Sequence, residues 1–356
     1  MVVIPSCRQE QLVFDVQNTG VQMPTIPMSL GLNPLAARTR KYLKRIHQGK
    51  VRDTYEIPSH PDKLLVIATD RLSIFDFVLG QYVQEKGEIL TAMTIFWLRN
   101  IFSDVPHHLI AYGSEIDAYL PEALRSLPNL QKRAIIVKKL NMLPIECIVR
   151  GYLTGSGLAA YKETRMVCGH VLPEGLHDGS KLTTPLFTPT TKPTEGHDEH
   201  VTAESVLTEY GEMPCRTALM IYERAAEFAL ERDIIIADMK IEMSLDGVLA
   251  DEVLTPDSCR FWDSGAYSIA VQKRTSPTGF DKELVRQAGK QAVMDGRYVD
   301  LSKMELTHTN AEAVGRWKIP VDVLRQTMER YHTIFQRLTG MSLKEFQQNI
   351  MDIHET

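Results

Sequence analysis

Cysteine is scarce in this sequence, and long apolar runs are missing. No apolar stretch approaches the roughly 18 residues that a membrane-spanning helix requires, and the first 30 residues do not combine a charged start with an apolar core. No membrane span or secretion signal is therefore expected. The cysteines are odd in number, scattered and without a C-x-x-C pair, which argues against a disulfide framework and favours the reducing cytoplasm. They are Cys7, Cys147, Cys168, Cys215 and Cys259.

Neither sign of charge dominates the chain. The 40 Lys and Arg and the 45 Asp and Glu residues are interspersed and give a net charge of −5. A nucleic-acid binder driven by phosphate electrostatics is not expected, although a local basic pocket is compatible with this balance. G-x-G-x-x-G after a strand and G-x-x-x-x-G-K-[ST] are both absent, so dinucleotide-binding and Walker-type functions are unsupported.

The length of 356 residues allows one large domain or two lobes. Paired strands mixed with helices, without βαβ regularity, predict an α+β fold. Residues 1–38 are expected to form an N-terminal extension. We predict strands over 63–69, 133–140 and 145–153, an amphipathic helix over 88–102, a Pro/Thr-rich loop over 181–202 and a helix near 215–232.

The C-terminal hundred residues are expected to be mainly helical. Leu324, Met328, Tyr331, Phe335 and Leu338 follow the 3.6-residue period, which predicts a buried helix face rather than a ligand site. Gly340 marks the end of this helix. Ser342 and Glu345 then form a capping-box pattern for a last helix.

Two apolar runs, 234–243 and 248–254, flank Asp246-Gly247 and predict a β-hairpin. If the turn closes there, Leu245 pairs with Val248, and Glu242 lies opposite Asp251. Two opposed carboxylates repel unless a cation lies between them. Oxygen ligands beside a lysine suit Mg²⁺ shared with a phosphate. The alternative is a solvated acidic sheet edge. Lys240 and Asp238 are expected on one strand face.

Three further segments carry polar groups suited to phosphate. Lys50 and Arg52 alternate on one strand face after Gly49 and could hold a polyphosphate, or could be part of a solvated strand. Ser156 lies near the start of a predicted helix that follows Arg150. This position suits an anion bound at the helix N-terminus, and the alternative is that Ser156 simply caps the helix.

The third segment is the polar loop 188–199, which carries Lys192, His197 and Asp198. It is too rich in proline and threonine for a helical zinc motif, so a lid or substrate loop is expected. Downstream of Asp251, the chain is predicted to carry Arg260 back toward the hairpin.

Eight segments in order resemble the SAICAR synthetase (phosphoribosylaminoimidazole-succinocarboxamide synthase) family over roughly residues 40–290. They are GKVRDTYEI, ATDRLSIFDFVL, KGEILT with FW, IVRGYLTGSG, FTPTTKPTEGHDE, IIIADMKIEM, DEVLTPDSCRFW and GFDKELVR. One departure is Ile241-Glu242-Met243-Ser244, where the family usually shows Phe-Glu-Phe-Gly.

The resemblance implies a kinase-like or ATP-grasp-like nucleotide lobe, residues 39–142, with an antiparallel sheet. This lobe would pack on a second α+β lobe, residues 143–356, which would hold the substrates and Mg²⁺ and end in helices. The implied reaction condenses L-aspartate with the carboxylate of CAIR, an aminoimidazole ribonucleotide, at the expense of ATP. The products are SAICAR, ADP and phosphate in de novo purine (IMP) biosynthesis, through an acyl phosphate.

The resemblance also implies roles for individual residues. ATP would contact Gly49, Lys50, Val51, Arg52 and Lys138. CAIR would contact Arg150, Ser156 and Arg260. Mg²⁺ would bind Glu242 and Asp251. Catalysis would use Lys240, Asp238, Lys192 and Asp198. Asp281, Lys282 and Arg286 match a later motif whose role stays open.

The expected partners are ATP, CAIR and L-aspartate, with no nucleic acid or membrane, in a monomer or small homo-oligomer. A kinase built on the same lobe is the competing enzyme class, but H-R-D and D-F-G are absent. A non-enzymatic scaffold is disfavoured because every candidate metal, phosphate and ribonucleotide residue is present.

Overall fold

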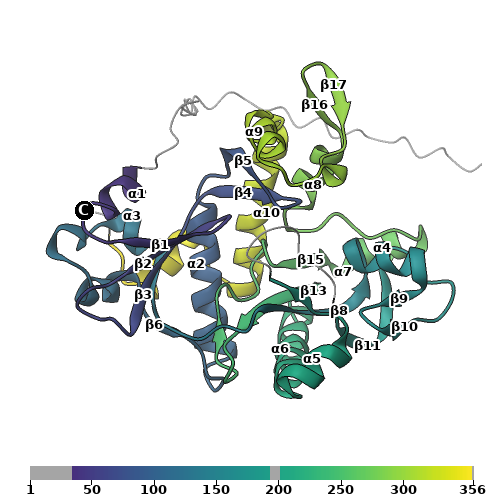
Figure 1. The fold of residues 1–356 in the computed structure, drawn as a ribbon, viewed down its shortest axis with the longest axis horizontal. Helices are drawn as coiled ribbons and strands as arrows, with labels where there is room; N and C mark the ends of the chain where they lie inside the picture. The colour runs from purple at the N-terminus through teal and green to yellow at the C-terminus, as the bar shows by residue number, and fades with distance from the viewer. Residues whose placement is uncertain (1–33, 193–200, 355–356) are drawn as a thin grey trace, which may run out of the picture.

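Two antiparallel sheets organise the chain in the computed structural model, which describes residues 34–192 and 201–354 (Figure 1). The first sheet has the order β1-β2-β3-β7-β6, formed by Arg45–Gln48, Arg52–Glu56, Lys63–Ala68, Ala134–Lys138 and Leu109–Tyr112. The second has the order β11-β8-β13-β14, formed by Ser180–Phe187, Ile145–Leu153, Ile234–Met243 and Leu249–Ala250. In it β12 (Thr190–Thr191) pairs with β8, and β15 (Cys259–Asp263) pairs with β13. The predicted α+β class is confirmed.

Helices and small hairpins cover these sheets. The helices are α1 (Pro34–Thr39), α2 (Lys86–Phe96), α3 (Pro128–Gln131), α4 (Gly155–Thr164), α5 (Ala203–Tyr210), α6 (Met213–Leu230), α7 (Ser264–Gln272), α8 (Glu283–Lys290), α9 (His308–Arg316), α10 (Val321–Thr339) and α11 (Leu343–Asn349). A π-helical turn, Trp97–Ile101, extends α2, and 3₁₀ turns lie at Gly113–Tyr119, Glu122–Leu124 and Leu301–Lys303. The hairpins are β4–β5 (Arg71–Ile74, Phe77–Tyr82), β9–β10 (Met166–Val167, His170–Val171) and β16–β17 (Ala292–Met294, Arg297–Val299).

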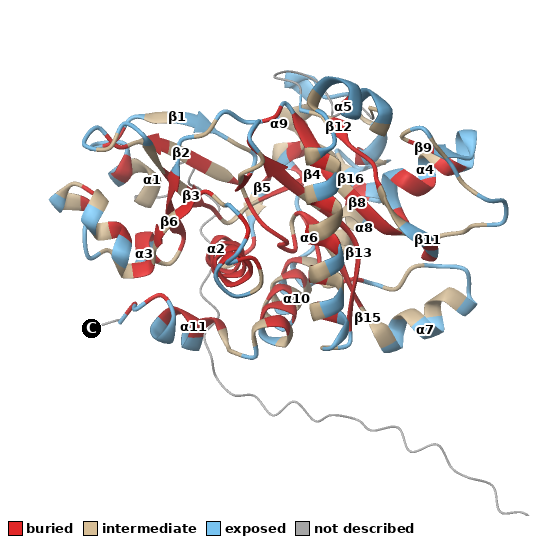
Figure 2. Ribbon diagram, turned by 90° about the horizontal axis from the view of Figure 1, so that it is seen from below, coloured by how far each residue is buried: buried red, intermediate tan, exposed pale blue. Residues whose placement is uncertain are grey.

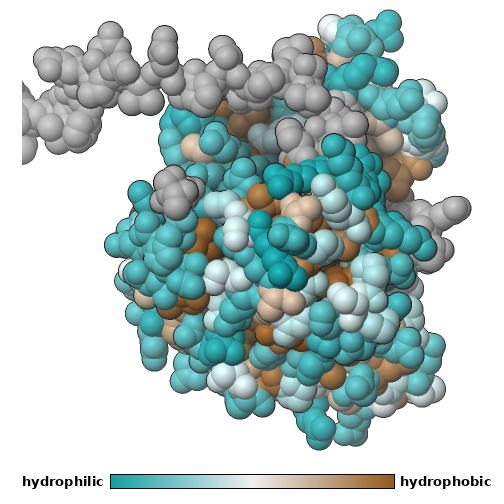
Figure 3. Space-filling model, turned by 90° about the vertical axis from the view of Figure 1, so that its left-hand side faces the viewer, coloured by the Kyte–Doolittle hydropathy of each residue, from teal (hydrophilic) through white to brown (hydrophobic). Residues whose placement is uncertain are grey.

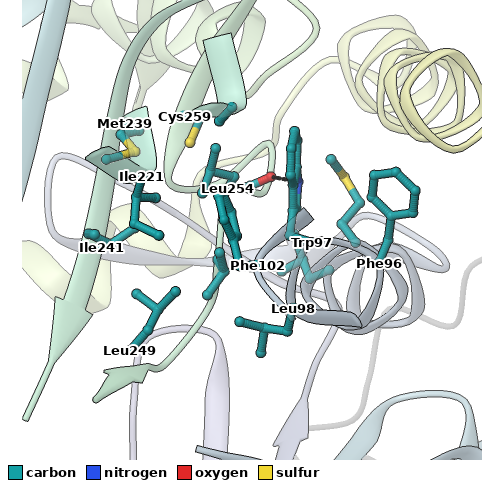
Figure 4. Packing of buried hydrophobic residues seen from close by; sticks show 14 of the residues in the cluster. Phe96, Trp97, Leu98, Phe102, Ile221, Met239, Ile241, Leu249, Leu254 and Cys259 are labelled. Atoms are coloured by element: carbon teal, nitrogen blue, oxygen red, sulfur yellow. Dashed lines mark hydrogen bonds between the residues drawn. The ribbon is translucent and has the colours of Figure 1, made fainter. Parts of the chain in front are cut away.

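Helix α2 is buried on every side, and the prediction that it is amphipathic is wrong. All eleven of its residues are buried, and Figure 2 shows it in the interior of the molecule. Its charged residues are paired: Glu88 accepts a hydrogen bond of 2.7 Å from Arg133. Beyond its end, the Trp97 indole donates to the Leu254 carbonyl at 3.0 Å (Figure 4). One apolar core surrounds this helix and includes Ile135 and Ile241, which lie on opposite sides of the expected lobe boundary.

The C-terminal helices follow the predicted pattern. Leu324, Tyr331, Phe335 and Leu338 are buried on α10, which ends at Gly340 with a φ of 74°. The capping box of Ser342 and Glu345 at the start of α11 is confirmed. After α11 the chain returns to the 3₁₀ turn that follows β6, where the Ser114 N–H donates to the Met351 carbonyl at 2.9 Å.

One prediction about a loop needs correction. The segment 181–202, expected to be a loop, contributes most of β11 and all of β12 to the edge of β8. Its threonines suit an edge strand as well as a loop. The predicted strands near 133–140 and 145–153 both form. They belong to different sheets, since β7 pairs with β3 and β6 whereas β8 pairs with β11 and β13.

The face of the molecule in Figure 3 is mostly hydrophilic, with hydrophobic residues scattered over it. None of the helices within residues 34–192 and 201–354 combines the length and apolar composition that a bilayer crossing requires.

Candidate functional site

A cleft of about 1560 Å³ is lined by both sheets. Its walls come from the turn between β1 and β2, one face of β3 and β7, strands β8 and β13, the start of α4 and helix α8. Every described residue that the sequence placed in the site lines this cleft, although they come from segments far apart in the chain. Asp198 and the neighbouring His197 fall outside the described residues.

The β13–β14 hairpin has a different register from the predicted one. Glu242 lies opposite Ala250, and Met243 lies opposite Leu249. The loop holds three residues rather than two, because Ser244 N–H donates to the Val248 carbonyl at 3.0 Å. The Ser244 hydroxyl also accepts from the Val248 N–H at 3.0 Å. The predicted pairing of Glu242 with Asp251 is therefore wrong by one residue.

Asp251 nevertheless reaches the same cleft as Glu242. It follows β14 directly and has a φ of 57°, in the left-handed region that non-glycine residues seldom adopt. This backbone conformation interrupts the alternation of side chains along the strand, so register alone does not decide which way the carboxylate points. Both carboxylates line the cleft.

Three cationic side chains stabilise these carboxylates. Arg52 contacts Asp251 Oδ2 at 2.5 Å and Glu252 at 2.9 Å. Lys192 forms an ion pair with Glu242, and Lys240 lies 3.9 Å from Glu242. The prediction was that the like charges of Glu242 and Asp251 need a cation between them. In the structure, protein side chains balance both charges.

The two carboxylates differ in how readily they take a proton. Burial is the main cause that raises the pKa of Glu242, and the charge of Asp251 raises it further. Burial would also raise the pKa of Asp251, but Arg52 and then Lys192 hold it well below its ordinary value. Asp251 is therefore the ionised partner that anchors the positive charges.

These oxygen donors fit a hard divalent cation. Within the described residues, no cluster of three or more His, Cys, Asp or Glu side chains is arranged to hold a metal by itself. Two carboxylates without sulfur or imidazole ligands suit Mg²⁺, which commonly takes its remaining ligands from phosphate and water. Glu242 and Asp251 are the residues that could hold it.

Asp238 lies between two arginines on the central strand of the second sheet. The pairing of β13 places it opposite Arg150 of β8 and Arg260 of β15. Asp238 Oδ2 accepts a hydrogen bond from Arg150 at 2.9 Å and another from Arg260 at 2.5 Å. Arg150 also donates to the Ser156 hydroxyl at 3.0 Å, near the start of α4. Two guanidiniums, a hydroxyl and a helix start thus form an anion-binding corner.

The turn between β1 and β2 forms the opposite end of the cleft. The Gly49 N–H donates to the Arg52 carbonyl at 2.7 Å, and Lys50 pairs with Asp76 at 2.5 Å. Val51 is buried and Lys138 is exposed, and both line the cleft. Apolar side chains of the first sheet form the wall between them, namely Leu64, Val66, Ala68, Ile135 and Val137.

Glu146 and His108 are among the buried polar residues of the cleft that sequence reasoning missed. Glu146 Oε1 accepts from Lys240 at 2.5 Å. Burial alone would lower the pKa of Lys240, but Glu146 and Glu242 raise it above its ordinary value. His108 is 5% exposed, and its Nε2 has no hydrogen-bond partner among the described residues. Burial lowers the pKa of His108 to about 4, so the imidazole is neutral near pH 7.

Comparisons with known proteins agree on one family. The family model described as SAICAR synthetase matches residues 45–299. A phosphoribosylaminoimidazole-succinocarboxamide synthase of Methylibium petroleiphilum is 41% identical over 86% of this chain and 98% of the relative. The enzyme of that name from Thioalkalivibrio sulfidiphilus is 42% identical over 87% of this chain and 99% of its own length. A solved SAICAR synthase from Saccharomyces cerevisiae, complexed with SAICAR, is 33% identical with a TM-score of 0.69 and covers 84% of this chain and 96% of that chain.

Proposed function

The chain belongs to the SAICAR synthetase family of ATP-dependent ligases in purine biosynthesis, and we propose that it condenses CAIR with L-aspartate to give SAICAR, ADP and phosphate. The observation that best supports this proposal is that two anion-binding regions, one at each end, line the same cleft. The Arg150–Ser156–Arg260 corner suits a phosphate monoester, and the Gly49–Arg52 turn suits a polyphosphate.

Between these ends lie the groups suited to the reacting atoms. A carboxylate is a poor electrophile, so ATP first converts the CAIR carboxylate into an acyl phosphate. The aspartate amine then attacks the acyl carbon, a C–N bond forms, the C–O bond to phosphate breaks, and the nitrogen gives up its proton. Lys240, which Glu146 holds in its charged form, is placed to bind the carboxylate oxygens.

The remaining roles follow from position along the cleft. The Gly49–Arg52 turn and Lys138 bind the nucleotide, with the apolar wall of β3 and β7 against its base. Asp238 keeps Arg150 and Arg260 together on the ribonucleotide phosphate. Glu242 and Asp251 would hold Mg²⁺, which when bound neutralises charge on the phosphoryl group. Lys192 and Asp198 belong to the loop expected to border the reacting groups.

An ADP-release assay with each component omitted in turn tests the proposal. ADP formation should require CAIR, L-aspartate and Mg²⁺ together. A kinase with another acceptor would release ADP in the presence of that acceptor without L-aspartate. A scaffold protein would show no turnover under any combination. Either of these results would overturn the proposal. The cytoplasmic location and the monomeric or small homo-oligomeric state stay predictions.

A further inference from the structure

Strand β13 changes the face that its side chains present partway along its length. Before Ala237, the even-numbered residues Ile234 and Ile236 are buried in the apolar core around α2. After it, the odd-numbered residues Met239 and Ile241 are buried in the same core (Figure 4). A regular strand keeps residues of one parity on one face. The strand therefore accommodates an extra residue between Ile236 and Met239.

The extra residue forms a β-bulge in the pairing of β13 with β15. Ile236 lies opposite Phe261, and Asp238 lies opposite Arg260. Two residues of β13 thus advance the ladder by one residue of β15, which is the definition of a bulge. Ala237, at the bulge, belongs to a separate apolar cluster, and Asp238 lines the cleft. Both side chains therefore point away from the core around α2.

This bulge decides which residues of β13 reach the reaction site. Asp238, Lys240 and Glu242 line the cleft. If the alternation set by Ile234 and Ile236 continued without the extra residue, these three side chains would be buried in the core instead. The reason is that a shift of one residue turns every side chain of a strand to the opposite face. The charged groups of the site therefore depend on the bulge for their direction.

Tyr222 of α6 contacts the bulge from the core side. It is 4% exposed, and its hydroxyl donates a hydrogen bond of 2.7 Å to the carbonyl of Ile236, directly before the extra residue. Burial is the main cause that raises the pKa of Tyr222, and a hydrogen bond with the backbone of Gly151 opposes this effect. The hydroxyl thus lies between β13 and β8.

Gly151 leaves the space that this hydroxyl occupies. A Cβ at this position would lie 1.9 Å from the Tyr222 oxygen. Gly151 directly follows Arg150, which is paired with Asp238 in the ladder between β8 and β13. The hydroxyl therefore lies next to the pair of residues that forms the anion-binding corner. It also provides a donor for the Ile236 carbonyl, which a buried backbone acceptor requires.

We propose that Tyr222 is a positioning residue whose hydroxyl holds the bulge that directs Asp238, Lys240 and Glu242 into the cleft. Tyr222 itself lies outside the cleft and acts through Asp238, which is adjacent to the bulge. The inference rests on the proposed function and deepens it, because it names a residue on which the ribonucleotide end of the site depends.

The effect should be strongest at the anion-binding corner. Asp238 is the first of the three cleft residues after the bulge, and it has no cation other than the two arginines of the corner among its printed partners. Lys240 and Glu242 lie further along the strand and are held by additional ion pairs, with Glu146 and Lys192 respectively. Loss of the hydroxyl should therefore disturb CAIR binding more than nucleotide binding.

Steady-state kinetics of Tyr222→Phe test the inference. The change removes the hydroxyl and keeps the ring, so the Ile236 carbonyl loses its donor while the apolar packing stays. The KM for CAIR should rise about fivefold or more, because an unsatisfied buried acceptor is costly enough to shift the bulge. The KM for ATP should change less than about twofold on the same scale.

Tyr161→Phe is the matched control. Tyr161 is 7% exposed, and its hydroxyl donates to the Pro173 carbonyl at 2.8 Å, so this variant also loses a buried hydroxyl with its hydrogen bond. Tyr161 belongs to α4 and lies outside the cleft. Both variants should lower Tm, but Tyr161→Phe should keep the wild-type KM for CAIR. A merely structural role of Tyr222 would make the two variants alike.

Gly151→Ala provides a second variant at the same contact. Its methyl group would displace the Tyr222 hydroxyl from the opposite side, so the KM for CAIR should rise as in Tyr222→Phe. In the double variant the two rises should not multiply, because both changes remove one and the same contact. Rises that multiply would indicate two independent contributions and would overturn the inference.

Amide hydrogen exchange provides a reading that does not depend on activity. Exchange over residues 148–152 and 234–240 should be faster in Tyr222→Phe than in Tyr161→Phe, because the loss of the hydroxyl loosens the bulge locally. Equal exchange in the two variants would contradict the inference. An equal rise of the KM values for CAIR and ATP in Tyr222→Phe would also contradict it, since that result indicates general damage to the cleft.

The outcome is separable from that of the proposed function. If the wild type releases no ADP with CAIR, L-aspartate and Mg²⁺, the proposed function fails before any variant is compared. If the wild type is active and Tyr222→Phe has the same KM for CAIR as Tyr161→Phe, the inference alone fails.

Discussion

A single carboxylate keeps two arginines together in the anion-binding corner. Arg150 is 2% exposed, and its repulsion from Arg260 is offset by the oxygen of Asp238 that both contact. Two arginines this close are stable only while the Asp238 carboxylate is present, because an unpaired buried charge costs folding free energy. The guanidiniums are therefore already positioned before an anion binds, which reduces the ordering that binding requires.

Arg150→Ala should mainly weaken binding of CAIR. The variant loses a charge-assisted contact to the phosphate and keeps Arg260, so we expect the KM for CAIR to rise about tenfold to a hundredfold. The KM for ATP should stay near the wild-type value. Initial rates at varied CAIR and ATP concentrations provide the measurement. An unaltered KM for CAIR would remove Arg150 from the ribonucleotide site.

Glu242→Ala and Asp251→Asn should each lower the turnover number by roughly a hundredfold or more. The reason is that a divalent ion contributes several kcal/mol of charge stabilisation in the transition state, and each factor of ten corresponds to about 1.4 kcal/mol. Saturating ADP-release rates measure the effect, and circular dichroism checks the fold. Wild-type-like turnover in either variant would refute the assignment to the metal.

Glu242→Gln is the matched control for the loss of charge alone. It keeps the length of the side chain and a hydrogen bond to Lys192 while it removes the negative charge. If Gln restores most of the activity lost with Ala, the role of Glu242 is positional rather than ligation of a cation.

The strands and helices were more predictable than the contacts between them. The apolar run 234–243 predicted β13 with its observed bounds, and the Asp246-Gly247 turn was in the right place. The register differed because Asp-Gly suits loops of two or three residues, and the choice depended on the Ser244 hydroxyl. Sequence periodicity describes one element at a time, so it could not show that α2 has partners on every side.

The residues missed in the cleft were missed for two different reasons. His108 belongs to no spaced motif and reaches the cleft because an isolated bridge joins His107, just before β6, to Leu249 of β14. Glu146 did carry a signal, since it is a charged residue in the otherwise apolar start of IECIVRGYL. A buried carboxylate in a strand needs a partner, and Lys240 on the neighbouring strand provides it.

Ser342→Ala should destabilise the packing of α11. The Ser342 hydroxyl accepts from the Glu345 N–H, and the Glu345 carboxylate accepts from the Ser342 N–H at 2.8 Å. Loss of such a cap costs about 1 kcal/mol. Urea unfolding followed by fluorescence measures the change, and Gln348→Ala, an exposed site on the same helix, is the control. Equal stability of Ser342→Ala and the control would show that the cap does not contribute.

A buried ion pair connects three parts of the molecule. Lys86 at the start of α2 lies 2.6 Å from Asp257, in the segment before β15, and their side chains are 0% and 2% exposed. Tyr331 of α10 donates to the other Asp257 oxygen at 2.6 Å. Burial would raise the pKa of Asp257, but Lys86, Lys282 and these hydrogen bonds hold it well below its ordinary value.

Asp257→Asn should therefore cost stability in a pH-dependent way. Removal of one partner of a buried pair costs about 3–5 kcal/mol at neutral pH. Because the folded-state pKa of Asp257 is depressed, its contribution is complete above the unfolded-state pKa of about 3.9 and is lost as pH falls below it. The difference in unfolding free energy between wild type and variant should thus stay nearly constant above about pH 5 and narrow progressively as pH falls below about 4. Chemical denaturation at several pH values measures it, and a constant difference would contradict the pH argument.

The contact of the C-terminal segment with the 3₁₀ turn that follows β6, at the side of the first sheet, has a consequence for synthesis of the protein. Ser114 donates to Asp352, 238 residues later, and a Cβ on Gly113 would lie 1.9 Å from the Met351 carbonyl. Figure 1 places the C-terminal end beside this sheet. A nascent chain on the ribosome must therefore keep that surface uncovered until residues 351 and 352 have left the exit tunnel. Chaperones have this interval in which to bind it, and premature termination before α11 would leave the surface open to degradation.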